Sequence, residues 1–226
     1  MLRQIMGSIL SGLQAVQSRI GKVADRPVTL IAVSKTCPAE AIREAFVAGQ
    51  RVFGESYVSE ALEKMKDLSD LGIEWHFIGP VQGNKTRAIA ENFSWVHGVD
   101  REKIARRLSD ARPGNLPPLQ VCIQVNVSGE ESKSGVEPSG VASLAKYVSA
   151  LPRLRLRGLM AIPEPSEDPS LQRSRFAQLR KLKEDLCGQG FPLDTLSMGM
   201  SGDFENAILE GATMVRIGSA IFGNRK

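Results

Sequence analysis

The sequence has few of the side chains that build metal centres and disulfide frameworks. Its 226 residues include three cysteines and two histidines. Cys37, Cys122 and Cys187 are far apart and lack CxxC spacing, so the sequence predicts neither a disulfide framework nor a zinc site. His76 and His97 are too few for a histidine-based metal site, and no carboxylates show ligand spacing. We therefore expect no metal, and a reducing compartment such as the cytoplasm.

Long apolar runs and blocks of one charge are also missing. No stretch is long and apolar enough to cross a membrane, so we expect no membrane association. Lys and Arg number 29 against 25 Asp and Glu, giving a net charge of +4. The two signs are interspersed, without a basic run or an aromatic-interleaved stripe, which argues against nucleic acid as a partner.

Short β-rich segments alternate with longer helical patterns along the chain. The spacing predicts strands at 28–34, 51–54, 74–78, 95–97, 119–127, 154–160, 195–198 and 213–217. It predicts helices between them at 38–48, 57–68, 85–91, 101–110, 139–150, 171–187 and 203–209. Eight β/α units with short connections predict an α/β fold, a single (β/α)₈ TIM barrel.

The segment before the first predicted strand has an apolar pattern of its own. Ile9, Leu13, Val16 and Ile20 recur at helical spacing, and glutamines interrupt any apolar core of the kind a signal peptide has. We expect an extra helix over 1–22 that packs on the barrel. With 42% hydrophobic residues, the whole chain, 1–226, is expected to form one domain.

A lysine follows the first predicted strand. The run from Val28 to Val33 is typical of a strand buried on both faces of a parallel sheet, and Lys35 stands where that strand leaves the core. An ammonium pressed against apolar walls loses hydration, which favours the neutral amine, and a neutral amine attacks carbonyls to form Schiff bases. The alternative is a lysine that extends from the strand end into water.

Two loops near the C-terminus are rich in small residues. The predicted strands 195–198 and 213–217 run into the segments 197–203 and 216–220, after strands seven and eight, where barrels commonly bind phosphate. Glycines let the backbone approach a phosphate, and Ser201 and Ser219 add hydroxyl donors. The same glycines also suit tight turns without a ligand. Neither loop matches a Walker A or GxGxxG pattern, so no nucleotide is implied.

Arg216 stands on an otherwise apolar predicted strand. A guanidinium inside a barrel needs an acceptor, and Glu210 or a carbonyl could serve, so a structural ion pair and a ligand contact both remain open. In a closed barrel Lys35 on strand one and Arg216 on strand eight are neighbours. Lysine, arginine and phosphate loops together suggest a phosphorylated aldehyde held as an imine. Pyridoxal 5′-phosphate fits this description, with Arg216 donating to the pyridine nitrogen.

Six ordered segments resemble signature segments of the pyridoxal phosphate homeostasis protein family, also called YggS/PROSC. They are Val33-Ser34-Lys35, Phe53-Gly54-Glu55, His76-Phe77-Ile78-Gly79, Gly158-Leu159-Met160, Ser197-Met198-Gly199-Met200-Ser201 and Val215-Arg216-Ile217-Gly218. The resemblance implies a fold type III barrel related to the N-terminal barrel of alanine racemase. It implies Lys35 as the imine lysine, Arg216 as the partner of the ring nitrogen, and three phosphate contacts, Ser201, Gly218 and Ser219.

Further candidate cofactor-binding residues are Gly202, His76, Ser197 and Ile217. For His76 the alternative is a hydrogen-bonded histidine at a strand end. The chain also departs from the family pattern. Ser56 stands where relatives usually have Asn, and Gly83 stands where they commonly have Ser. We therefore transfer no cofactor contact to Ser56 or Gly83.

The resemblance implies a function in intracellular cofactor homeostasis or delivery, with effects on amino-acid and keto-acid balance and without strong catalytic activity. An arginine that donates to the ring nitrogen disfavours its protonation and weakens the electron sink. The expected partners are pyridoxal phosphate and the apo-enzymes that receive it, and a monomer is expected. Two alternatives remain, a pyridoxal-phosphate-dependent amino-acid racemase and a Schiff-base aldolase acting on a phosphorylated substrate.

Overall fold

The described residues form a closed parallel barrel. A computed structural model describes residues 2–128 and 134–223 of the chain, with side chains from residue 9 onward. Met1 of the expected helix and residues 129–133 and 224–226 of the expected domain lie outside that part. The strands follow each other around the barrel in sequence order, and β8 closes it against β1. They are β1 (Thr29–Val33), β2 (Val52–Glu55), β3 (Glu74–Phe77), β4 (Trp95–Val99), β5 (Leu119–Gln124), β6 (Leu154–Met160), β7 (Thr195–Ser197) and β8 (Met214–Ile217).

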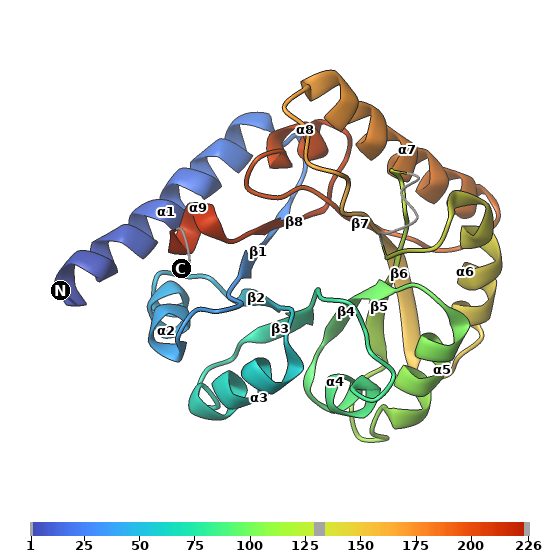
Figure 1. Ribbon diagram of the computed structural model, residues 1–226, viewed down its shortest axis with the longest axis horizontal. Helices are drawn as coiled ribbons and strands as arrows, with labels where there is room; N and C mark the ends of the chain where they lie inside the picture. The colour runs from blue at the N-terminus through green and yellow to red at the C-terminus, as the bar shows by residue number, and fades with distance from the viewer. Residues whose placement is uncertain (1, 129–133, 224–226) are drawn as a thin grey trace.

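Helices surround the barrel on the outside, so the predicted (β/α)₈ architecture is confirmed (Figure 1). They are α1 (Leu2–Val23), α2 (Ala39–Val47), α3 (Val58–Asp67), α4 (Thr86–Asn92), α5 (Glu102–Ala111), the 3₁₀ turn η1 (Pro138–Gly140), α6 (Val141–Ser149), α7 (Pro169–Gly188), α8 (Phe204–Leu209) and α9 (Ser219–Phe222). The sequence did not predict α9. The predicted strand 119–127 is too long, because pairing beyond Gln124 is limited to an isolated bridge between Val125 and Val136.

Side chains alternate along the strands between the barrel interior and the helix layer. Ile31 on β1 and Met214 on β8 belong to a small apolar cluster inside the barrel. Because the side-chain period of a strand is two, Val33 and Lys35 follow Ile31 on the interior side, and Arg216 follows Met214. The register pairs Ile31 with Arg216 across β1 and β8. The alternation therefore brings the lysine and the arginine to the same end of the interior.

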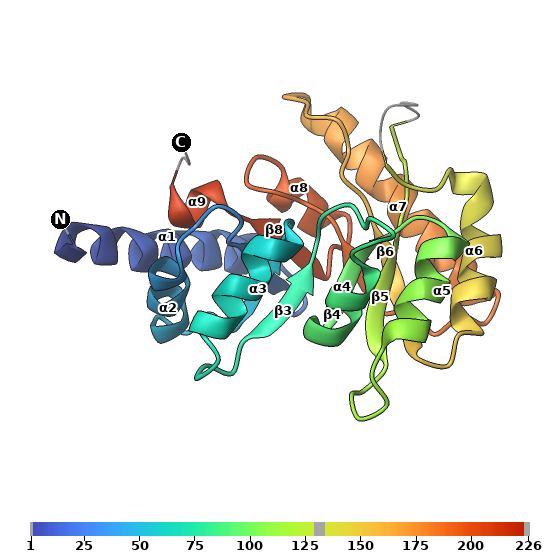
Figure 2. The same ribbon diagram turned by 60° about the horizontal axis from the view of Figure 1, so that its bottom comes forward.

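Helix α1 lies against α2, α8 and α9 on the outside of the barrel (Figures 1 and 2). The four residues of its predicted apolar face are buried: Ile9, Leu13, Val16 and Ile20. At Gly12 a Cβ atom would lie 2.8 Å from the carbonyl oxygen of Ala220, so glycine is needed where α1 meets α9. Arg19 binds Glu205 on α8 through two hydrogen bonds of 2.8 and 3.0 Å. Helix α1 thus packs against α8 and α9, the two helices that follow the small-residue loops.

Candidate functional site

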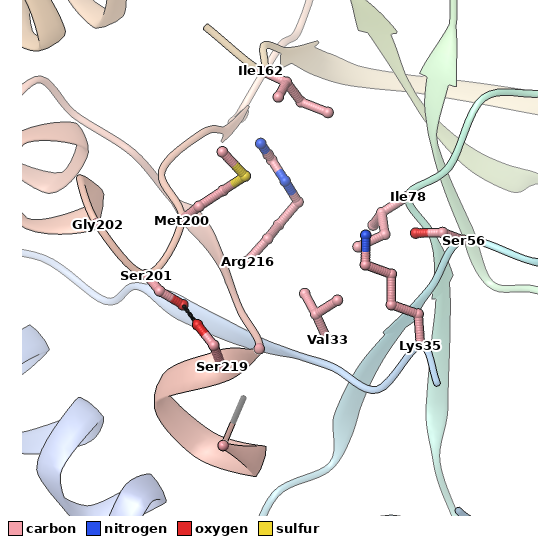
Figure 3. A pocket seen from close by; sticks show the side chains of 12 residues that line it. Val33, Lys35, Ser56, Ile78, Ile162, Met200, Ser201, Gly202, Arg216 and Ser219 are labelled. Atoms are coloured by element: carbon pink, nitrogen blue, oxygen red, sulfur yellow. Dashed lines mark hydrogen bonds between the residues drawn. The ribbon is translucent and has the colours of Figure 1, made fainter. Parts of the chain in front are cut away.

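A cavity of about 500 Å³ opens at the carboxyl ends of the strands. Lys35 and Arg216 lie on opposite sides of it, and the loops after β7 and β8 form a third side (Figure 3). Six of the predicted site residues line this cavity: Lys35, Ser201, Gly202, Arg216, Gly218 and Ser219. The remaining wall consists of Val33, Ser56, Ile78, Ile162, Met200 and Gly223. An amine, a guanidinium and two small-residue loops therefore share one space.

Lys35 is exposed to solvent in this cavity. Its ammonium extends from the end of β1 toward the centre of the cavity, on the side of Ser56 and Ile78 (Figure 3). The expectation that apolar walls strip its hydration is therefore wrong for this structure, because the strand end turns the side chain into the open mouth. Lys35 is therefore accessible to a ligand in the cavity.

The turn after Lys35 has an unusual backbone. Thr36 has φ of 61°, a left-handed conformation that a β-branched residue rarely adopts. Its N–H donates to Glu60 Oε1 on α3 at 2.5 Å. That carboxylate also accepts a short hydrogen bond from Lys64, one helical turn further along α3. The strained turn is thus tied to α3 through a charged side chain.

A buried charged cluster, here called the Glu55 cluster, lies between β1, β2 and α3 and consists of Ser34, Glu55, Glu60 and Lys64. Lys64 Nζ donates to the Ser34 carbonyl oxygen and to Glu55 Oε1, both at 2.8 Å. Ser34 Oγ donates to the same Glu55 oxygen at 2.6 Å. Burial raises the pKa of Glu55, although its hydrogen bonds with Lys64 and Ser34 act in the opposite direction. The cluster thus connects the carboxyl ends of β1 and β2, next to Lys35, with α3.

Arg216 is buried and points into the barrel interior beneath the cavity. Its Nη1 donates to Ser197 Oγ at 2.7 Å, and its Nη2 donates to the carbonyl oxygen of Ala161 at 2.8 Å. Burial lowers the pKa of Arg216 to about 10, so it stays charged at neutral pH. Of the two acceptors expected from the sequence, the carbonyl is confirmed. Glu210 is wrong, because it pairs on the outside with Arg173 at 2.7 Å and Arg180 at 3.3 Å.

The loops after β7 and β8 meet at one side of the cavity. Ser219 Oγ donates to Ser201 Oγ at 3.2 Å (Figure 3). Gly199 has φ of +91°, and a Cβ atom there would lie 2.6 Å from Ala207 Cβ, so only glycine fits this turn. At Gly202 a Cβ atom would meet nothing within 4 Å. The backbone here faces open space.

The same two loops present hydrogen-bond donors to that space. Among the described residues, no acceptor is found for the backbone N–H groups of three residues that line the cavity, Ser201, Gly202 and Ser219. Two hydroxyl groups stand next to these amides. Backbone amides and hydroxyls are the donors that commonly bind phosphate oxygens. The loops therefore fit a phosphate group on geometry and donor chemistry.

Three predicted site residues do not line the cavity. His76 and Ser197 are fully buried in the barrel interior, where they take part in a hydrogen-bonded chain below Arg216. The sequence left open a hydrogen-bonded histidine at a strand end; His76 lies within β3, one residue before its end, and is hydrogen-bonded to Glu74 and His97. Ile217 is also fully buried, and it packs in the outer core because it follows Arg216 with the opposite side-chain direction.

Several lining residues were not predicted as site residues. Ile78, Ile162 and Met200 are apolar residues next to strand ends, and such residues are also typical of barrel packing. A second cavity of about 480 Å³ adjoins the first and shares Lys35, Ser56, Ile78 and Ile162 with it. Its other polar lining includes Tyr57, Gln82 and Lys85. Gly83 lies in a separate depression beside Arg107.

The described residues also bear on metal binding and membrane spans. No group of three or more His, Cys, Asp or Glu side chains among them could hold a metal ion. No helix formed by those residues has the length and apolar character needed to cross a membrane.

The fold and the site define the class of protein. The family model of the alanine racemase N-terminal domain matches residues 11–226. That match covers the barrel and most of α1, in agreement with the fold described above.

More similar relatives narrow this class. The pyridoxal phosphate homeostasis protein of Pseudomonas aeruginosa is 58% identical over 226 residues, covering 97% of each chain. That of Escherichia coli K12 is 50% identical, covering 97% of this chain and 98% of that protein. The solved structure of PipY from Synechococcus elongatus with pyridoxal phosphate bound is 38% identical with a TM-score of 0.87, covering 95% of this chain and 100% of that chain. The chain belongs to the pyridoxal phosphate homeostasis protein family.

Proposed function

We propose that this protein binds pyridoxal 5′-phosphate in the 500 Å³ cavity and holds it covalently on Lys35. The observation that carries the proposal is the convergence of an accessible amine, a buried guanidinium and two donor-rich loops on one cavity. The cavity volume lies within the range of roughly 300–1,000 Å³ typical of small-molecule sites. PipY, a relative with the same fold, has this cofactor bound in its solved structure.

Each wall of the cavity matches a different part of the cofactor. The neutral amine of Lys35 would attack the aldehyde carbon. Loss of the aldehyde oxygen as water would leave a C=N bond, which is the Schiff base. The loops carrying Ser201, Gly202, Gly218 and Ser219 would bind the phosphate through amides and hydroxyls. Arg216 would donate to the ring nitrogen. Its two described hydrogen bonds use only Nη1 and Nη2, which leaves its Nε–H available.

The environment of Arg216 favours holding the cofactor over catalysis. Pyridoxal phosphate supplies an aldehyde that condenses with amines and a ring that withdraws electrons when its nitrogen is protonated. A charged guanidinium that donates to this nitrogen disfavours its protonation. We therefore propose a role in cofactor homeostasis or delivery in the cytoplasm, with effects on amino-acid and keto-acid balance that follow from cofactor supply.

The absorbance spectrum of the purified protein tests the covalent link. We expect a band near the visible edge that disappears in Lys35→Ala, and borohydride should fix the cofactor on the wild type without any added substrate. Lys85→Ala is the matched control, because Lys85 lines the neighbouring cavity and not this one, and it should leave the band unchanged. A wild type that is colourless and does not bind added pyridoxal phosphate would overturn the proposal. Trapping that requires a phosphorylated sugar would instead favour an aldolase.

A transfer assay tests the role in delivery. The loaded protein is mixed with increasing concentrations of an apo-enzyme that uses pyridoxal phosphate, and activation of that enzyme is followed. Direct delivery predicts a rate that rises with acceptor concentration beyond the spontaneous release rate. A rate that stays at the release rate would limit the protein to a reservoir. Exchange of an amino acid's α-proton with solvent, lost in Lys35→Ala, would favour the racemase alternative.

A further inference from the structure

A hydrogen-bonded chain runs through the barrel interior and ends at Arg216. We call it the interior chain; its members are Glu74, His76, His97, Ser197 and Arg216. Glu74 Oε1 lies 2.7 Å from His76 Nε2, and His76 Nδ1 lies 2.9 Å from His97 Nε2. His97 Nδ1 lies 2.8 Å from Ser197 Oγ, which accepts from Arg216 Nη1 at 2.7 Å. The interior chain thus links the amino end of β3 to Arg216 at the cavity, with side chains from β3, β4, β7 and β8.

With Glu74 ionised and both imidazoles neutral, the donors and acceptors allow the interior chain one consistent direction. Arginine can only donate, so Ser197 Oγ accepts from Arg216 and its single hydroxyl hydrogen is free to point at His97 Nδ1. His97 then carries its proton on Nε2 and donates to His76 Nδ1. His76 in turn carries its proton on Nε2 and donates to the Glu74 carboxylate. The reverse direction would need a protonated Glu74, whereas its hydrogen bond with His76 lowers the pKa of Glu74.

Burial keeps both histidines in the neutral form that this direction requires. His76 and His97 are fully buried, and burial lowers the pKa of each, in His97 well below its ordinary value. The His76 ring stacks on Trp95 with centroids 5.2 Å apart, which holds its orientation. A neutral imidazole passes a hydrogen bond on because one nitrogen donates while the other accepts.

The hydrogen bonds of the interior chain determine the direction of the Ser197 hydroxyl hydrogen. No carboxylate contacts Arg216 among the described residues; its described partners are the Ser197 hydroxyl and the Ala161 carbonyl. With the hydroxyl hydrogen held by His97, the lone pairs of Ser197 Oγ remain directed at Arg216. Without His97 that hydrogen could turn toward the guanidinium and repel it. The orientation of Arg216 therefore depends on a residue two hydrogen bonds away.

We infer that His97 is a positioning residue for Arg216, and that the Glu74–His76–His97–Ser197 series is a directional hydrogen-bond relay that keeps the Arg216 Nε–H aimed at the cofactor ring. This inference rests on the proposed function, because it concerns how the same wall of the cavity is held. It predicts two separate properties, a tautomeric state in the ligand-free protein and an effect on the bound cofactor.

Nitrogen-15 NMR of the ligand-free protein tests the direction of the relay. His76 and His97 are the only histidines in the sequence, so imidazole labelling reports on the interior chain alone. At neutral pH we expect both rings neutral, with the proton on Nε2 and a bare Nδ1. A proton on Nδ1 of either ring, or a charged ring, would overturn the relay. This measurement needs no cofactor, so its outcome is independent of whether the proposed function holds.

Cofactor affinity and the absorbance of the loaded protein test the positioning role. His97→Leu removes the acceptor for Ser197, and we expect the dissociation constant for pyridoxal phosphate to rise about tenfold with a shifted absorbance band. His97→Asn offers its Oδ1 in place of Nδ1 and should stay within about threefold of the wild type. Cys122→Ala, a change in the same interior at a residue outside the chain, should lower the melting temperature but leave affinity and band unchanged.

The outcomes separate a positioning role from a packing role. A lower melting temperature in His97→Leu with unchanged affinity and absorbance would contradict the positioning role, and so would equal losses in His97→Leu and His97→Asn. If the wild type itself does not bind pyridoxal phosphate, the proposed function fails while the tautomer measurement still stands.

Discussion

Two polar assemblies support opposite walls of the cavity, and they differ in where their charge lies. The Glu55 cluster stands outside the barrel and pairs a buried ammonium with two carboxylates behind an exposed Lys35. The interior chain stands inside the barrel and uses neutral imidazoles and a hydroxyl behind a buried Arg216. The residue proposed to form and break a bond is accessible, whereas the residue proposed to orient the ring is enclosed.

The difference follows from what surrounds each assembly. Helix α3 supplies Lys64 and Glu60 to the Glu55 cluster, so the Lys64 ammonium forms direct ion pairs with the carboxylates of Glu55 and Glu60. The interior chain receives its side chains from strands, and burial lowers the pKa values of its two histidines, so the imidazoles stay neutral next to Arg216. A series of hydrogen bonds through neutral groups connects Arg216 across the barrel with Glu74, whose side chain is about half exposed (48%). Substitutions and pH changes at the two assemblies test this contrast, from the largest expected effect to the smallest.

Lys64→Met should destabilise the protein most. It removes the partner of a Glu55 side chain that has no solvent exposure, and breaking a buried ion pair costs about 3–5 kcal/mol. Urea unfolding would measure the change in the free energy of unfolding. Lys66→Met, at an exposed position of the same helix, should change it by less than about 0.5 kcal/mol. Equal effects of the two substitutions would contradict the structural role of the Glu55 cluster.

Acid should weaken the protein through the interior chain. The folded-state pKa values of His76 and His97 are lowered, so the unfolded chain binds these protons more tightly. Their contribution to stability is present above the ordinary pKa of 6.5 and is lost as pH falls from there toward the lowered values. The loss is at most about 1.4 kcal/mol per pH unit for each histidine. His97→Asn should reduce the pH dependence between pH 7 and 5 in urea unfolding. A wild type with unchanged stability over that range would rule the prediction out.

Glu55→Gln and Glu74→Gln should change the pH dependence of stability in opposite directions. Burial raises the pKa of Glu55, so the ionisable side chain contributes most below its ordinary pKa of 4.5 and that contribution is lost as pH rises through the raised value. The hydrogen bond with His76 lowers the pKa of Glu74, so its contribution is present above 4.5 and is lost as pH falls through the lowered value. Differences in unfolding free energy between wild type and each variant, measured from pH 3 to 7, should slope oppositely; parallel slopes would contradict the contrast.

Thr36→Gly should have the smallest effect on stability. Glycine relieves the left-handed strain of about 1–2 kcal/mol but raises the entropy of the unfolded chain, so the net change should stay within about 1 kcal/mol. The turn that holds Lys35 should loosen, and release of pyridoxal phosphate should become faster. Melting temperature and release rate, each compared with Ala48→Gly at the end of α2, would measure both effects. A slower release would show that the strained turn does not hold Lys35 in place.

The regular elements were predictable because their signals are local. Apolar runs of β-rich residues fix the strands, and the spacing of Ile9, Leu13, Val16 and Ile20 fixes the buried face of α1. The start of α7 was expected at residue 171, but the helix begins at Pro169 because Asp168 accepts from the Ser170 N–H at 2.8 Å. The four-residue α9 escaped prediction because a single turn leaves no periodic pattern.

The candidate site was predictable where its residues lie at or just after the carboxyl ends of strands. Lys35, Arg216 and the serine loops carry chemistry that a barrel brings to one end. The interior chain was not predictable, because His76 and His97 lie 21 residues apart, and His97 and Ser197 lie 100 apart. Nor could the sequence predict the partner of Arg216, since Glu210 is nearer along the chain than Ser197 but faces the outer helices.

The sequence by itself determined the eight β/α units, the inward direction of Lys35 and Arg216 through the alternation of the strands, and the small residues of the two loops. Only the tertiary structure decided that Lys35 stands exposed and Arg216 enclosed. Closure of the barrel sets how far each strand end lies from solvent, and it brings distant imidazoles and hydroxyls within hydrogen-bonding distance. Both are properties of packing between strands, which no single segment of the sequence contains.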